Sequence, residues 1–303
     1  MSSIPVHNEV AGSLADLRPA SSAISVTTER ANARVKQRIA ENFSRAADSY
    51  DQAAILQKRV AARTMLGLPA RLSSEQPGSK ALPSHRILDL GTGTGLHTLT
   101  LAERYDNAVV IGMDLAMGML QFARHNTSHP RVDWCSGDIE SMPLQSGAVD
   151  LIYSSLAIQW CDFEQVLGEV SRVLKPGGTF VFSTLAEGSL AELDNAWCLA
   201  GENNRVNRFD SVDTQKQRLN ASDLVCQAFS LKPETLFYSN VISLLRSLKA
   251  LGVNTVLADK GGLVTRRKLE ALQQAYEKMR QPEGLPLTYQ VIYGVLQKPV
   301  CEQ

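Results

Sequence analysis

The stretch Arg86–Gly95, RILDLGTGTG, decides the fold, because a short apolar run leads directly into three glycines at alternate positions. Arg86–Leu90 has the pattern of a buried strand, and Leu96–Arg104 behind the glycines has the periodicity of a helix. Glycines in such a turn let the chain bend tightly and bring backbone N–H groups against a ligand at the helix N-terminus. The stretch therefore predicts a strand, a ligand-binding loop and a helix in series.

Strand and helix patterns alternate beyond this loop. Strands are expected at 109–114, 132–136, 149–154 and 179–185, and helices at 117–125 and 163–174. Lys175–Gly178, KPGG, is expected to break the second of these helices. The alternation predicts an α/β protein built from parallel βαβ units with right-handed crossovers.

Both ends of the chain differ from this alternating part. Towards the N-terminus, apolar residues at steps of three or four predict one helix from about residue 35 to 53 and another from 55 to 66. Residues 69–84 are rich in Pro, Gly and Ser and are typical of a linker. Towards the C-terminus, helices are expected at 190–199, 211–219, 241–251 and 265–279, and strands at 234–239 and 288–297.

Composition excludes several classes of function. Lys plus Arg and Asp plus Glu both number 31, so the net charge is zero and the basic excess of a nucleic-acid-binding protein is missing. The sequence has no apolar run of the ~20 residues that span a bilayer, and its start lacks the pattern of a secretory signal. Its five cysteines form no C-x-x-C motif, which argues against a metal site and favours reduced thiols in a cytoplasmic protein.

Three acidic residues follow or end predicted strands, namely Asp89, Asp114 and Asp138. The glycines follow G-x-G-x-G rather than the G-x-G-x-x-G of dinucleotide-binding loops, and Asp89 would repel a pyrophosphate. A cationic nucleoside with a sulfonium and an ammonium would instead be stabilised by these carboxylates at the carboxyl edge of the sheet. For each residue alone, a simple turn or capping role is the alternative.

This set of motifs resembles the class I S-adenosylmethionine-dependent methyltransferases. Further stretches are similar to the malonyl-[acyl-carrier protein] O-methyltransferase family, which acts in biotin biosynthesis. They are Phe43–Asp51 (FSRAADSYD), Ser154–Cys161 (SSLAIQWC), Leu245–Gly252 (LRSLKALG) and Pro286–Tyr289 (PLTY). The resemblance covers about residues 34–298.

The resemblance implies a Rossmann-like fold with a mostly parallel seven-stranded sheet, an antiparallel last strand, helices on both faces and an N-terminal helical lid. We expect a disordered tail at 1–30 and a single domain at 31–303. Within the domain, the expected parts are the lid (31–68), the linker (69–84), the cofactor-binding core (85–186), a helical segment on the substrate side (187–285) and the last strand (286–298).

The resemblance also implies site residues. The expected S-adenosylmethionine-binding residues are Arg45, Asp89, Gly91, Gly93, Gly95, Asp114, Leu115, Asp138, Ile139 and Ser154. On the acceptor side, Tyr50 is expected to line the methyl path and Trp160 to form a wall of the substrate tunnel. Arg208 or Arg246 is expected to pair with the acceptor carboxylate. The alternatives are core packing for Tyr50 and Trp160 and a solvated surface position for the arginines.

The implied reaction is methylation of the free carboxylate of a malonyl thioester on acyl carrier protein or coenzyme A. A carboxylate with a pKa near ~4 is already ionised at neutral pH, so no general base is required. The alternatives are a methyltransferase for another small acceptor, such as a quinone precursor, and a cofactor-binding scaffold without turnover. Basic clusters at 36–63 and 266–268 are candidates for docking an acidic carrier protein, although solvated faces have the same composition.

Overall fold

The structure is a computed structural model that describes residues 21–72, 85–203, 205–251 and 265–300. The chain divides into two compact units, residues 1–37 and 38–303, and helix α1 (Ser21–Ala53) begins in the first and ends in the second. Residues 21–30 of the expected tail are thus helical. Residues 1–20 of that tail and 73–84 of the expected linker lie outside the described residues.

The second unit is built on the predicted seven-stranded sheet, whose strand order is β3-β2-β1-β4-β5-β7-β6. The strands are β1 (His85–Leu90), β2 (Ala108–Asp114), β3 (Val132–Ser136), β4 (Val149–Ser155), β5 (Leu174–Leu185), β6 (Val225–Tyr238) and β7 (Leu285–Gln297). β1 to β5 are parallel, whereas β7 runs antiparallel to both of its neighbours. The expected fold class is therefore confirmed.

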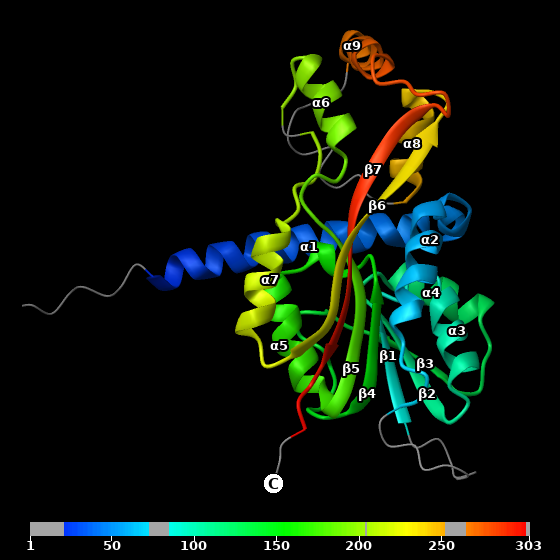
Figure 1. The fold of residues 1–303 in the computed structure, drawn as a ribbon, viewed down its shortest axis with the longest axis vertical. Helices are drawn as coiled ribbons and strands as arrows, with labels where there is room; N and C mark the ends of the chain where they lie inside the picture. The colour runs from blue at the N-terminus through cyan, green and yellow to red at the C-terminus, as the bar shows by residue number, and fades with distance from the viewer. Residues whose placement is uncertain (1–20, 73–84, 204, 252–264, 301–303) are drawn as a thin grey trace, which may run out of the picture. The chain divides into compact units, whose positions relative to one another are not determined.

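Helices cover both faces of this sheet (Figure 1). Helices α5 (Phe163–Val173) and α7 (Val212–Ala221) lie on one face, where Leu88, Phe180 and Phe182 contribute to the core. On the other face are α2 (Ile55–Thr64), α3 (Leu96–Arg104) and α4 (Met117–Asn126). Since both faces are covered, the central strands β1 and β4 are buried along almost their whole length instead of alternating between buried and exposed residues.

The α5 helix shows how sequence specifies these elements. Asp162 caps it by accepting hydrogen bonds from the N–H groups of Glu164 and Gln165. Its buried residues recur at steps of three or four, which is the spacing of a single helix face. The helix ends at Val173, as the KPGG sequence predicts. The KPGG residues themselves form a bulge inside β5, because the pairing with β4 shifts register there.

The antiparallel pair of β6 and β7 extends beyond the end of β5, as far as the paired residues Tyr238 and Leu285 (Figure 1). Helices α6 (Ala191–Leu199), α8 (Val241–Ala250) and α9 (Arg266–Glu277) pack around this extension. Leu56 and Val60 of α2 join the same hydrophobic core. A helical layer therefore stands beside the carboxyl edge of the sheet.

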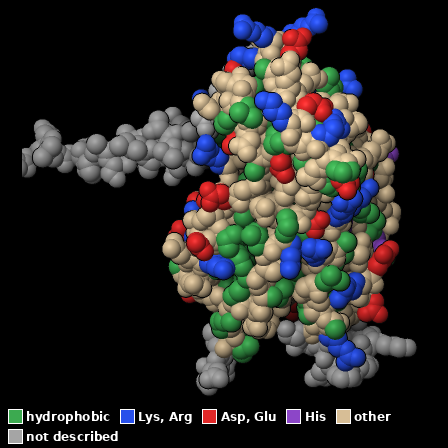
Figure 2. Space-filling model, turned by 45° about the horizontal axis from the view of Figure 1, so that its top comes forward, with side chains coloured by type: hydrophobic (Ala, Val, Ile, Leu, Met, Phe, Trp, Pro, Cys, Tyr) green, Lys and Arg blue, Asp and Glu red, His purple; other side chains and the backbone are tan. Residues whose placement is uncertain are grey.

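On the face shown in Figure 2, acidic and basic side chains are interspersed. In the described part of the chain, no helix combines the length and apolar character that crossing a membrane requires.

Candidate active site

The glycine loop joins β1 to α3 and takes a conformation that only glycine adopts easily. Gly91, Gly93 and Gly95 all have positive φ angles, of 69°, 56° and 84°. A Cβ atom on Gly91 would lie 2.3 Å from the Cβ of Ala157, and one on Gly95 would lie 2.5 Å from the ring of Trp134. At Gly93 a Cβ atom would meet nothing within 4 Å. The ends of the loop are therefore packed, while its middle faces open space.

Asp114 at the end of β2 fixes this loop. Its carboxylate accepts hydrogen bonds from the N–H groups of Gly93 (2.9 Å) and Ala116 (2.8 Å). Burial raises the pKa of Asp114, and these backbone hydrogen bonds act in the opposite direction. A carboxylate offers about four acceptor positions, so Asp114 retains capacity for hydroxyl donors of a ligand.

Asp89 lies deeper, at the end of β1, and is 2% exposed. Its Oδ2 accepts a hydrogen bond from the Thr98 hydroxyl (2.6 Å), and that hydroxyl contacts the hydroxyl of Thr92. Burial raises the pKa of Asp89 from 3.8 to about 6, although the threonine hydroxyls favour the ionised form. Asp89 is therefore a costly anion that a nearby cation would stabilise.

The third acid, Asp138, lies beyond β3 at the same edge of the sheet. Its Oδ1 accepts a hydrogen bond from the N–H of Glu140 (3.0 Å), which is an Asx-turn. Ile139 is 9% exposed and packs mainly into the core. Leu115, with 38% of its surface exposed, provides apolar surface at this edge. The structure thus brings all three predicted acids to one edge of the sheet.

The C-terminal part of α1 contacts the glycine loop and the N-terminus of α4. The hydroxyl of Thr94 donates to the Asp51 carboxylate (2.8 Å), and the N–H of Gly118 donates to the Ser44 hydroxyl (3.0 Å). A Cβ atom on Gly118 would lie 2.7 Å from Ser44 backbone atoms, so glycine permits this close approach. The predicted lid helix therefore meets the loop through specific polar contacts.

Aromatic residues connect this helix to the segment after β4, which forms a short 3₁₀ turn, η2 (Ile158–Trp160). Phe43 packs edge-on against Trp160 and Tyr50, with ring centroids 5.9 and 6.3 Å apart. Burial and the Asp114 and Asp51 carboxylates raise the pKa of Tyr50, which therefore stays protonated. The predicted pair Tyr50 and Trp160 is brought together through Phe43.

A cleft between α2 and the glycine loop contains two residues that the sequence reasoning did not assign to the site. They are Gln57 and Lys58, which line the cleft together with Tyr50 and Asp51. The Gln57 Oε1 is buried and accepts no hydrogen bond from any residue that the structure describes. The Lys58 ammonium donates to the Asp51 backbone carbonyl (2.7 Å). Adjacent residues on a helix do not face each other, so the sequence Gln57-Lys58 does not indicate a shared binding site.

Arg45 does not reach this cleft. It is exposed, and its guanidinium bonds to the Glu41 carbonyl (3.3 Å) and to Asn42 within the same helix. Ser154 lies at the carboxyl end of β4 next to Leu90, and its hydroxyl donates to the Leu90 carbonyl (3.0 Å). Ser154 therefore lies at the edge of the site, whereas Arg45 is not among the residues that line the cleft.

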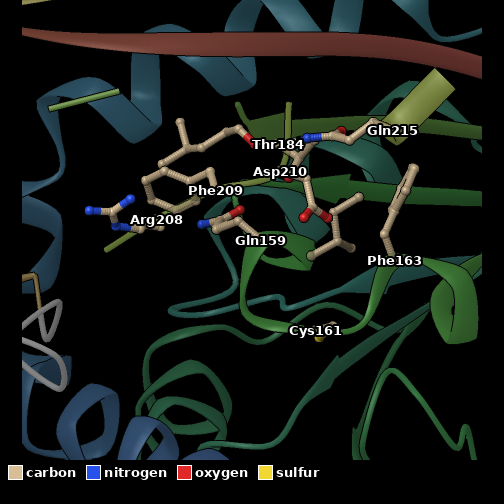
Figure 3. A pocket seen from close by; sticks show the side chains of 10 residues that line it. Gln159, Cys161, Phe163, Thr184, Arg208, Phe209, Asp210 and Gln215 are labelled. Atoms are coloured by element: carbon tan, nitrogen blue, oxygen red, sulfur yellow. Dashed lines mark hydrogen bonds between the residues drawn. The ribbon is translucent and has the colours of Figure 1, made fainter. Parts of the chain in front are cut away.

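The two predicted acceptor-side arginines are separated. Arg208 is exposed and lines a cavity of about 180 Å³ at the carboxyl ends of β4 and β5. Figure 3 places Arg208 at one end of this cavity, Gln159 near the middle and Gln215 with Phe163 at the other end. Arg246 is exposed on α8, whose buried side packs into the core around the extended part of β6 and β7.

The electrostatics of the cleft favour a cation. Among the described residues, no ion pair involves Asp51, Asp89 or Asp114, although all three border the glycine loop. A ligand with an ammonium, a sulfonium and ribose hydroxyls matches these carboxylates and the unpartnered Gln57 oxygen, so the residues fit S-adenosylmethionine. No cluster of three potential metal ligands occurs in the described residues.

Comparisons with known proteins agree with this chemistry. Residues 88–182 match the family described as Methyltransferase domain. A putative methyltransferase from Bacillus halodurans has a similar structure, with a TM-score of 0.52 and 17% identity over 79% of this chain and 99% of that one, which supports the fold.

Two relatives narrow the family. The biotin biosynthesis bifunctional protein BioHC of Cellvibrio japonicus is 42% identical over 87% of this chain, which spans about half (50%) of that protein's length. A malonyl-[acyl-carrier protein] O-methyltransferase of Serratia marcescens is 41% identical over 86% of this chain and 95% of that protein. The resemblance seen in the sequence is thereby confirmed: this chain belongs to the malonyl-[acyl-carrier protein] O-methyltransferase family.

Proposed function

We propose that this chain methylates the free carboxylate of a malonyl group carried as a thioester by acyl carrier protein, or by coenzyme A, in biotin biosynthesis. The proposal rests mainly on the carboxylates of Asp51, Asp89 and Asp114, which border the open glycine loop in a chain of this family. S-adenosylmethionine, when bound, supplies the methyl group from its sulfonium, which becomes a neutral thioether as the carboxylate becomes a neutral ester.

The cofactor-binding roles follow from position and charge. Asp114 is proposed to accept hydrogen bonds from the ribose hydroxyls. Asp89, which is buried at the end of β1, is proposed to stabilise the positive charge of the ligand. Asp138 is proposed to accept from the adenine amino group, with Ile139 and Leu115 as apolar contacts.

The amino-acid end of the cofactor is proposed to lie in the cleft at α2. The Gln57 oxygen and the Ser154–Leu156 carbonyls would accept from its ammonium. Lys58 would pair with its carboxylate, because Lys58 lines the cleft whereas the Arg45 guanidinium bonds within its own helix. Replacing Lys58 by Ala should weaken S-adenosylmethionine binding about tenfold, with Arg45→Ala as the matched control that does not. Equal loss in both variants, measured by calorimetry, would show that Lys58 has no special position.

On the acceptor side, the residues orient and desolvate rather than transfer protons. The reaction neutralises opposite charges, so Tyr50 and Trp160 would favour it by excluding water from the methyl path. Both Arg208 and Arg246 are exposed. Arg208 is proposed to pair with the malonyl carboxylate, because it lines the cavity beside η2 and Arg246 does not.

Methyl transfer from labelled S-adenosylmethionine to malonyl-carrier protein tests the proposal, with acetyl-carrier protein as a control that lacks the free carboxylate. We expect a base-labile labelled ester on the malonyl form only. No label on it, under conditions in which S-adenosylhomocysteine raises the melting temperature, would refute the acceptor. Labelling of free dicarboxylic acids at an equal rate would point to a small-molecule acceptor.

A further inference from the structure

The cavity beside η2 shares a wall with the cofactor cleft. The segment Ala157–Trp160 contacts the glycine loop through Ala157 and the lid helix through Trp160, while Ile158 and Gln159 line the cavity. Its other walls come from the end of β5, from the segment 208–210 and from α7 (Figure 3). A molecule in the cavity would therefore be separated from the cofactor cleft only by the segment Ala157–Trp160.

Two glutamine side chains of this cavity have acceptor oxygens without a partner. Gln215 is 3% exposed, and its Nε2 donates to the Leu185 carbonyl (3.1 Å). The Gln159 Nε2 donates to the Leu156 carbonyl (2.6 Å). Neither Oε1 atom accepts a hydrogen bond from the residues that the structure describes, and both are buried. Because each nitrogen is anchored, each oxygen is held in place as an acceptor that a ligand could satisfy.

The remaining lining defines the chemistry of that ligand. Phe163, Phe209 and Leu185 are apolar, and Asp210 adds a carboxylate that pairs with Arg218. Because the cavity already holds the Asp210 carboxylate and two glutamine oxygens, an anionic ligand group beside them would be repelled. It suits an extended, largely apolar chain with N–H donors along its length.

We propose that this cavity binds the pantetheine arm of the thioester substrate, with Gln215 and Gln159 accepting hydrogen bonds from its two amide N–H groups. The inference rests on the proposed function, in which the malonyl group is carried on such an arm. It assigns recognition of the carrier's arm, rather than of the malonyl group, to α7 and η2. Arg208, at the other end of the cavity, remains the cation for the malonyl carboxylate.

Truncated substrates test the assignment. Malonyl-pantetheine keeps both amides, whereas the malonyl thioester of ethanethiol has none. Gln215→Met and Gln159→Met should each lower kcat/KM on malonyl-pantetheine by about 5- to 50-fold more than on the ethyl thioester, because only malonyl-pantetheine has amides that lose a buried acceptor. Gln165→Met, on the exposed side of α5, is the control and should change neither.

Each other outcome has a separate meaning. An equal loss on both thioesters would overturn the inference, since it would mark the glutamines as structural. Unchanged kinetics on both would show that the arm binds elsewhere. The Gln159 variant keeps the test valid if the deeply buried Gln215 variant unfolds. If the wild-type protein methylates neither thioester nor malonyl-carrier protein, the proposed function itself fails.

Discussion

Replacing Asp89 by Asn should stabilise the ligand-free protein and weaken cofactor binding at the same time. Burial raises the pKa of this carboxyl from 3.8 to about 6. The rise corresponds to a free-energy cost of about 3 kcal/mol when the group is ionised in the folded protein. Asn is uncharged, and its side-chain oxygen can still accept from the Thr98 hydroxyl.

The pH dependence of stability shows whether the Asp89 carboxyl stabilises or destabilises the folded protein. For a carboxyl whose pKa is raised by folding, its stabilisation is fully present below 3.8 and is lost as the pH rises through about 6. The stability advantage of the Asn variant should therefore be about 3 kcal/mol at pH 7.5 and about half of that at pH 5. Thermal unfolding of both proteins at these two pH values measures it as a difference of several degrees.

The same carboxylate should contribute to binding of a cationic ligand. Loss of its charge is expected to weaken S-adenosylmethionine by about 10- to 100-fold, measured by calorimetry at pH 7.5. In the wild-type protein, affinity should rise as the pH increases through about 6, because Asp89 then ionises. An Asn variant that is less stable at every pH, or that binds the cofactor normally, would refute this account of Asp89.

Two further substitutions separate the lid from the acceptor side. Gly118→Ala should displace α1, since the new Cβ would lie 2.7 Å from Ser44; we expect a destabilisation of about 1–3 kcal/mol and a raised KM for S-adenosylmethionine. Gly168→Ala is its control, because nothing lies within 4 Å there and alanine favours a helix. Arg208→Ala should lower kcat/KM for the malonyl substrate by about tenfold or more with unchanged cofactor affinity. Arg246→Ala should change neither kcat/KM nor cofactor affinity. If Arg246→Ala lowered kcat/KM and Arg208→Ala did not, the malonyl carboxylate would bind at α8 instead.

Sequence patterns predicted several elements with their bounds. The expected bounds of α3 agree with the structure, because the buried strand β1 and the glycine loop mark where the helix begins. The expected bounds of β3 also agree, although none of its residues is buried. The first half of β6, from Val225 to Pro233, was not predicted. It is an edge strand with mostly exposed residues, so no apolar alternation marks it.

Contacts between residues that are far apart in the sequence could not be predicted from the local sequence pattern. The three acids at the sheet edge were predicted, because strand order alone brings strand ends together. Lys58 was instead grouped with surface cations, since only the packing of α2 against the loop reveals the cleft. Among the described side chains, the deeply buried arginine is Arg205, paired with Glu202 over Trp197, rather than Arg208 or Arg246. Ion pairs of this kind depend on tertiary structure.

Two hydrophobic cores support the site, and each of them lies beneath parts of both the cofactor side and the acceptor side. Leu90 and Met113 pack with α5 beneath the edge that carries the acids. Leu56 and Val60 of α2 pack with α6, α8 and α9 around the extended end of the antiparallel β6–β7 pair. Ile158 and Phe163 of the acceptor cavity belong to the first core, whereas Leu185 of that cavity belongs to the second core. The same α2 helix carries Lys58 of the cofactor cleft. Because densely packed cores transmit substitutions mainly to the groups that they support, changes in either core should alter both cofactor affinity and acceptor use.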